Sequence, residues 1–190
     1  GDLLDEDAET IVIDITGVVN GDEAIQQTRT VTIIDDDATP TVTLVLGSVV
    51  IPEATGTTTV TAKLSAVSGQ DITVTLAKNT LSTATETADY TLVNTINIPA
   101  GNIEGSVVIS AVQDLIDEVD NETVVIDITA VQNGTEFGTQ QQTVNITDDD
   151  LAPTVILSVG STSIPETSGT TSVTVTLSAV SGLPVTVTLE

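Results

Sequence analysis

The chain repeats itself at a spacing of 113 residues, the difference between positions 35 and 148. Segment 35–42 recurs with two changes at 148–155, and segment 64–69 recurs unchanged at 177–182. Repeats of solenoid proteins are about 20–50 residues long, so a period of this length corresponds to a whole domain. We therefore expect the chain to hold part of a tandem array of similar domains.

This repeat divides the chain at about residues 38 and 150. Residues 39–150 are predicted to form one complete unit, residues 1–38 the C-terminal part of a preceding unit, and residues 151–190 the N-terminal part of a following one. A unit of about 110 residues is long enough for a single hydrophobic core. We expect two strands from the first part and three from the last, too few for a sandwich at either end.

Polar and apolar residues alternate along most of the complete unit. In segment 57–64, the even-numbered residues Thr58, Val60, Ala62 and Leu64 would lie on one face of an extended strand. This period of two is typical of half-buried antiparallel strands, and Thr, Val and Ile suit a pleated surface. Strands are predicted near 41–51, 57–66, 71–78, 92–98, 103–112, 122–131 and 139–147.

Seven short strands in one unit are typical of a Greek-key β-sandwich of the immunoglobulin type. No segment shows the 3.6-residue periodicity of a helix. The predicted fold class is therefore all-β, a tandem series of seven-stranded immunoglobulin-like sandwiches with almost no helix.

The charge of the chain restricts its partners. The net charge is −25 with only three Lys and Arg residues, so nucleic acids and anionic membranes would be repelled. Hydrophobic residues make up 39% of the chain, which argues against a disordered acidic tail. The chain has no Cys and no His, which removes thiol catalysis and the usual general base, and we see no pair of nucleophile and base. We therefore predict a protein that is not an enzyme, does not bind nucleic acid and does not insert into a membrane in this segment.

Acidic residues occur in segments that an immunoglobulin-like topology would bring to one end of the sandwich. In the complete unit they are Glu53, Asp89, Asp114, Asp117, Glu118, Glu122, Asp148, Asp149 and Asp150. Two unit charges about 5 Å apart repel by roughly 3 kcal/mol at an effective dielectric constant near 20, so such a cluster favours bound cations. Ca²⁺ takes about 6–8 oxygen ligands in flexible geometry, whereas zinc and copper favour the His and Cys that are absent.

The preceding partial unit has matching acidic residues. They are Asp2, Asp5, Glu6, Glu9, Asp35, Asp36 and Asp37. The counterparts of its other two acidic loops lie outside the sequence. The acidic loop of the complete unit, 114–122, is one residue longer than its counterpart at 2–9.

Five motifs in order resemble the Calx-beta domain family, which is known from sodium/calcium exchangers, integrin β4 and bacterial surface adhesins. The matching segments are 51–56, 87–90, 98–101, 114–122 and 147–150. The family fold is a seven-stranded sandwich, and some members bind several Ca²⁺ ions at one end. The resemblance implies ligand roles for Glu53, Asp89, Asp114, Glu118, Glu122 and Asp148 to Asp150, with Asp117 a less direct match. Gln113 stands where the family often has a further acid.

The main functional hypothesis is a calcium-stiffened stalk of a large extracellular or cell-surface protein, typical of a bacterial adhesin. Its partners would be the neighbouring repeats of the same chain, and its role would be mechanical reach. A regulatory calcium sensor is the first alternative, although near-identical tandem copies disfavour it. An adhesive ligand-binding or filament-forming module, with lateral self-association through Thr- and Val-rich edge strands, is the second.

Overall fold

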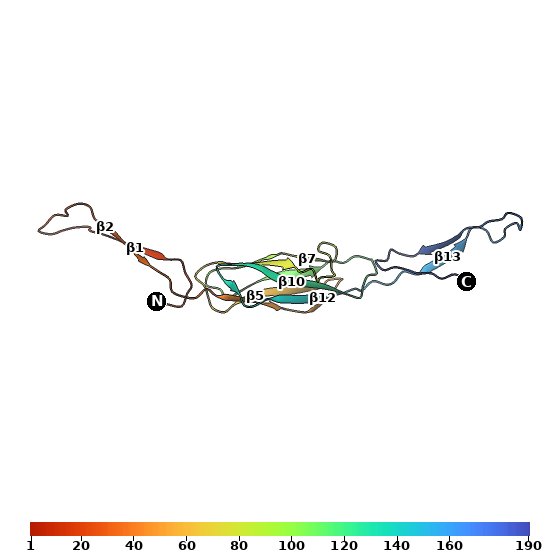
Figure 1. Ribbon diagram of the computed structural model, residues 1–190, viewed down its shortest axis with the longest axis horizontal. Helices are drawn as coiled ribbons and strands as arrows, with labels where there is room; N and C mark the ends of the chain where they lie inside the picture. Colours follow the sequence, from red (N-terminus) through yellow and green to blue (C-terminus); the bar gives the residue numbers. More distant parts are fainter.

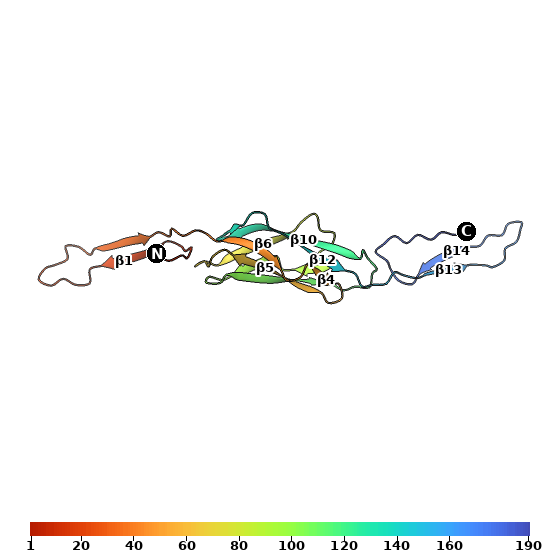
Figure 2. The same ribbon diagram turned by 90° about the horizontal axis from the view of Figure 1, so that it is seen from below.

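The computed structural model describes residues 1–190 and contains fourteen β-strands and no helix, so no helix is present that could cross a membrane. The molecule is elongated, with a central sandwich between two projecting hairpins (Figures 1 and 2). The prediction of an all-β fold with almost no helix is confirmed.

The central sandwich consists of two five-stranded sheets. One sheet has the order β4 (Val50–Pro52), β12 (Gln141–Thr147), β10 (Asn121–Gln132), β6 (Ile72–Lys78) and β8 (Thr95–Ile98). The other has the order β11 (Thr135–Glu136), β3 (Thr41–Leu46), β5 (Thr57–Leu64), β9 (Glu104–Ala111) and β7 (Tyr90–Leu92). Neighbours are antiparallel except for the pairs β4–β12 and β11–β3, which are parallel. The order β3-β5-β9-β7 facing β12-β10-β6 is that of an immunoglobulin-like sandwich.

Two predicted strands are each divided between the sheets. The strand expected at 41–51 becomes β3 in one sheet and β4 in the other, and the strand expected at 92–98 becomes β7 and β8. The short strand β11 was not predicted at all. Alternation shows which side chains face inward, but it does not show which sheet supplies the hydrogen-bond partners, because that depends on residues far away in the chain.

The core contains 19 buried apolar side chains between the two sheets. Thr58, Val60, Ala62 and Leu64 of β5 are all buried, which confirms the alternation expected for this strand. Tyr90 is the one aromatic residue in this core, and its hydroxyl group has no hydrogen-bond partner. Aliphatic packing therefore holds the sheets together.

The hairpins at each end reproduce parts of the central sandwich. Strands β1 (Glu9–Asp14) and β2 (Thr28–Ile33) correspond to β10 and β12 at the repeat spacing, while β13 (Val155–Val159) and β14 (Val173–Leu177) correspond to β3 and β5. The third strand expected after residue 151 is not formed, since the neighbours of β6 in the sandwich, β8 and β10, have no counterparts there. The apolar residues of both hairpins are exposed for the same reason.

Candidate metal centre

Four separate segments bring acidic side chains to one end of the central sandwich. Glu53 follows β4, Asp89 precedes β7, and segment 148–150 follows β12. The loop between β9 and β10 contributes Asp114 and Glu118. Glu122 lies at the start of β10. This end of the sandwich faces the following hairpin, which is formed by β13 and β14 (Figure 1).

The carboxylates form two groups of three. In the first group, Glu53, Asp114 and Asp150 each place one oxygen within 4.8 Å of the others. The second group, made of Asp89, Glu118 and Glu122, meets the same limit. A small cavity of ≈ 10 Å³ has Glu53 of the first group and all three members of the second in its wall, together with Asp148. The two groups therefore adjoin one another and share one cavity.

Backbone hydrogen bonds fix the position of Glu53. Its N–H donates to the Thr147 carbonyl at 2.9 Å, which continues the pairing of β4 with β12. The chain then turns tightly, and the Gly56 N–H donates to the Pro52 carbonyl at 2.8 Å. A Cβ atom at Gly56 would lie only 2.1 Å from that carbonyl oxygen, so the turn requires glycine. The turn leaves the Glu53 side chain almost fully buried, at 5% exposure.

The other loops are held by hydrogen bonds to the same carboxylates. The Asp114 N–H donates to Glu53 Oε1 at 3.0 Å, and Asp114 Oδ1 accepts from the Ile116 N–H at 2.7 Å. Asp89 accepts from the Thr85 N–H through its side chain and from the Val112 N–H through its carbonyl. These hydrogen bonds hold the carboxylates in place without the help of a bound ion.

Two carboxylate oxygens at this end are buried without a hydrogen-bond partner, Asp148 Oδ1 and Asp150 Oδ2. Buried polar atoms in folded proteins are almost always paired, because an unpaired one has lost its hydration without compensation. A hard cation would supply the missing interaction for both oxygens. The residues present therefore fit a divalent ion with a preference for oxygen ligands.

Burial, together with the crowding of the carboxylates, raises the pKa values of several of them. Burial is the main reason why the pKa of Glu53 is raised to about 6; the Asp114 N–H opposes this shift, and the neighbouring Asp148 adds to it. Burial and then a hydrogen bond with Asp89 raise the pKa of Glu122 to about 7. The pKa values of Glu118 and Asp150 are also raised, first by burial and then by the surrounding acids.

These shifts predict that the ion-free protein becomes less stable as pH increases. The ordinary glutamate pKa of 4.5 applies to the unfolded chain, so the folded chain binds protons more tightly. The resulting stability is fully present below about pH 4.5 and is lost as pH rises through the folded values of about 6 and about 7. In chelator, the midpoint of thermal unfolding should fall between mildly acidic and mildly alkaline buffer. The double variant Glu53→Gln/Glu122→Gln should flatten this dependence, and a midpoint that rises with pH would contradict the explanation.

Three of the candidate ligands in the complete unit lie outside both groups, namely Asp117, Asp148 and Asp149. Asp149 is exposed and belongs to neither group. Asp117 directs Oδ2 toward the hydroxyl of Ser181, at 3.0 Å, which belongs to the following unit. Asp148 lines the cavity that the two groups share, and the other six candidates are the members of the groups.

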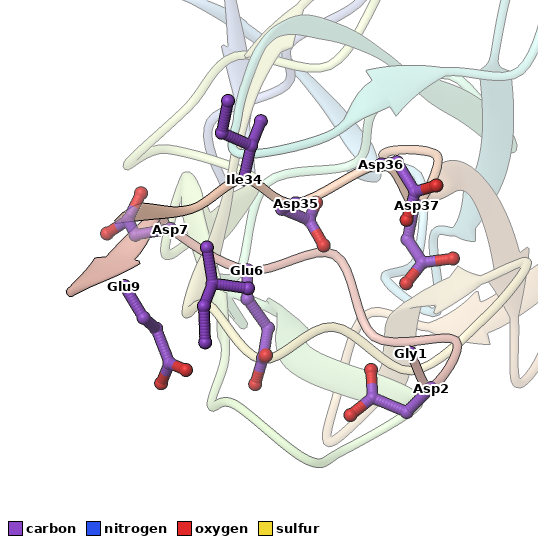
Figure 3. Close-up of a pocket in the computed structure, with 10 residues that line it drawn as sticks. Gly1, Asp2, Glu6, Asp7, Glu9, Ile34, Asp35, Asp36 and Asp37 are labelled. Carbon is purple, nitrogen blue, oxygen red and sulfur yellow. The ribbon is translucent and has the colours of Figure 1, made fainter. Parts of the chain in front are cut away.

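The acids of the preceding unit surround a wider pocket of ≈ 140 Å³, shown in Figure 3. Its wall is formed by some residues of segment 1–9 and by segment 33–37. The acidic residues in the wall are Asp2, Glu6, Asp7, Glu9, Asp35, Asp36 and Asp37. Sequence reasoning missed Asp7, whose place within the acidic loop was the available signal. Asp5 lies outside the pocket and contacts Ser68.

Comparison with known proteins gives matches among solved structures alone. No protein-family model matches the chain, and no curated protein does. The chain is similar to CBD12 from CALX1.2, with 20% identity and a TM-score of 0.47, over 57% of this chain and 44% of that one. It is also similar to the calcium binding domain CBD12 of CALX1.1, with 21% identity and a TM-score of 0.46, over 53% of this chain and 41% of that one.

A third similar structure is the apo form of the Calx CBD1 domain, with 21% identity and a TM-score of 0.47 over 58% of this chain and 99% of that domain. The chain spans less than half the length of the two CBD12 structures.

Proposed function

We propose that this chain is a segment of a calcium-stiffened, tandem-repeat stalk in an extracellular or cell-surface protein, of the kind found in bacterial adhesins. One observation carries the proposal. Two groups of three carboxylates, accompanied by two buried and unpaired carboxylate oxygens, lie at the end of the sandwich where the chain passes to the next unit. An ion bound there would act at a junction between units.

The chemistry of the groups favours calcium among the biological divalent cations. All the available ligands are carboxylate or backbone oxygens, which Ca²⁺ and Mg²⁺ prefer. The ligands come from four loops and are not arranged by one rigid element, and Ca²⁺ tolerates such irregular geometry better than Mg²⁺ does. In this proposal the residues that hold the ions are Glu53, Asp89, Asp114, Glu118, Glu122, Asp148 and Asp150.

The arrangement of the units supports a mechanical role. The chain advances along one direction from the first hairpin through the sandwich to the last (Figure 1). The connection between β12 and β13 is short, and Pro153 restricts its own backbone and that of the preceding residue. Neutralising the acidic end would remove repulsion that otherwise loosens this connection. Reach and stiffness then follow from the number of repeats, with no catalytic step.

A calcium titration of the chain by isothermal calorimetry in chelator-stripped buffer tests the proposal. We expect saturable binding, and we expect Asp114→Asn to weaken it by about tenfold or more because a ligand charge is lost. Glu104→Gln is the matched control, since it makes the same change of charge beside Lys63, outside the acidic cluster. Absence of binding, or equal effects of the two variants, would refute the proposal. A midpoint near millimolar calcium supports a structural site, whereas a micromolar midpoint would favour the sensor alternative.

A further inference from the structure

The acidic loop of the central unit contacts a turn of the following unit. The Asp117 carbonyl accepts a hydrogen bond from the Gly182 N–H at 2.9 Å, and Asp117 Oδ2 accepts one from the Ser181 hydroxyl at 3.0 Å. The two backbones pair as an isolated parallel bridge at Asp117 and Ser181. Ser181 lies just after β14, so the contact joins two segments that are separate from the covalent connection at 148–155.

The same contact occurs at the other junction in the chain. The Asp5 carbonyl accepts from the Gly69 N–H at 3.0 Å, and Asp5 pairs with Ser68 as a second isolated parallel bridge. The Ser68 hydroxyl donates to Asp5 Oδ2 at 3.5 Å. Asp5 and Ser68 are both buried, at 7% and 1% exposure. Two junctions thus form the contact with the same residue types.

Loop length does not disturb this contact. Asp117 follows Asp5 by 112 positions, whereas Glu122 follows Glu9 by 113. The extra residue of the longer loop therefore lies after the contacting aspartate. Both loops keep the same approach to the next unit, and the difference in length falls within the part that carries the last acid.

A glycine in the turn makes room for a candidate metal ligand. A Cβ atom at Gly182 would lie 3.2 Å from Cγ of Glu118, and one at Gly69 would lie 2.7 Å from Cγ of Glu6. Neither glycine has a positive φ, so conformation alone does not demand it. The stem of an acid in each acidic loop thus packs on the turn of the following unit.

Two positions beside the contact differ between the junctions, one on each of the two contacting segments. Gln70 Nε2 donates to Asp7 Oδ1 at 3.2 Å at the first junction. The corresponding positions at the second junction hold Leu183 and Val119. The residue types at these two positions thus change together, from polar at the first junction to apolar at the second.

We propose that the Ser-Gly turn at 181–182, and its counterpart at 68–69, is a docking surface for the acidic loop of the preceding unit, with Asp117 and Asp5 as the docking residues. The inference deepens the proposed stalk function by naming the surface through which neighbouring repeats meet. A chain connection alone leaves neighbouring units free to bend about it. A second attachment beside the connection restricts that bending, so the docked turn sets the direction of the next unit.

Disulfide trapping tests this surface in the full chain, which has no native cysteine. The pair Asp117→Cys/Ser181→Cys should cross-link within the molecule at least about tenfold faster than Asp117→Cys/Ser168→Cys, because proximity raises the effective concentration of the thiols. Ser168 lies in the turn between β13 and β14, at the far end of the same hairpin. Equal rates for the two pairs would overturn the proposal.

A third variant distinguishes cross-linking in the docked state from cross-linking by occasional collision of the two segments. Adding Gly182→Val to the Asp117→Cys/Ser181→Cys pair should slow cross-linking severalfold, because the new side chain meets the stem of Glu118. An unchanged rate would contradict docking.

The calcium titration tests a separate proposal. Fast cross-linking without calcium binding would leave the docking surface intact and remove the calcium proposal, and calcium binding with slow cross-linking would do the reverse.

Discussion

In saturating calcium the chain is expected to unfold at a temperature about 10–20 °C higher than in excess chelator. An ion that binds only the folded state, and is present at a concentration about 100 times its dissociation constant, adds about 2.7 kcal/mol to the free energy of unfolding. One kcal/mol shifts the midpoint of a domain of this size by about 4–8 °C. The ion also compensates for the burial and the repulsion that raise the pKa values of Glu53 and Glu122, so the gain should be largest above pH 7. Thermal unfolding followed by circular dichroism measures both effects.

Two control ions separate specific binding from simple screening. Magnesium at the same concentration should give a much smaller shift, because it requires near-ideal octahedral geometry and keeps its waters. Sodium chloride at matched ionic strength should also give a small shift, since buried charge pairs are screened less than exposed ones. Equal shifts for all three salts would mean that the acids form only a solvated, highly charged surface.

Gly56→Ala is expected to destabilise the central sandwich by roughly 2–3 kcal/mol and to weaken calcium binding at the same time. The new Cβ atom would lie 2.1 Å from the Pro52 carbonyl oxygen and 2.7 Å from Cβ of Ile51, so the turn must open. Ile51 belongs to the buried core, and Glu53 of the first carboxylate group lies within the same turn. One substitution therefore disturbs both the packing and the site.

Gly169→Ala is the matched control for this prediction. Gly169 occupies the same turn in the last hairpin, where its N–H donates to the Pro165 carbonyl and an added Cβ would lie 2.5 Å from that oxygen. No second sheet packs on this hairpin, so the variant should leave the unfolding of the central sandwich unchanged. Equal losses in the two variants would show that the tight turn does not act through the sandwich. Urea unfolding and calorimetry give the two quantities.

Much of the fold could be predicted from local pattern. The alternation in segment 57–64 placed Thr58, Val60, Ala62 and Leu64 on the buried face of β5, and the structure agrees. The division of the first predicted strand into β3 and β4 was not visible in the same way. Strand β4 pairs with β12, which lies near the other end of the unit in the sequence. The local sequence pattern does not indicate a partner so far away in the chain.

The candidate site shows a similar division. Sequence position was enough to predict that the acidic loops meet at one end of the sandwich, because loops that follow alternate strands of a sandwich meet at its ends. It did not show that Glu53 would group with Asp114 and Asp150, while Asp89 would group with Glu118 and Glu122. Side-chain groups of this kind depend on distances of a few ångströms between loops that the chain brings together only when it folds.

By itself, the sequence determined that this chain is all-β, with an aliphatic core, acidic loops and a sequence pattern that recurs after 113 residues, because periodicity and composition are local properties of the chain. Only the tertiary structure decided which sheet each edge segment joins and which carboxylates meet. It also showed that Asp117 contacts Ser181 of the next unit rather than either carboxylate group. These features depend on contacts between residues far apart in the sequence, and the folded backbone alone brings them together.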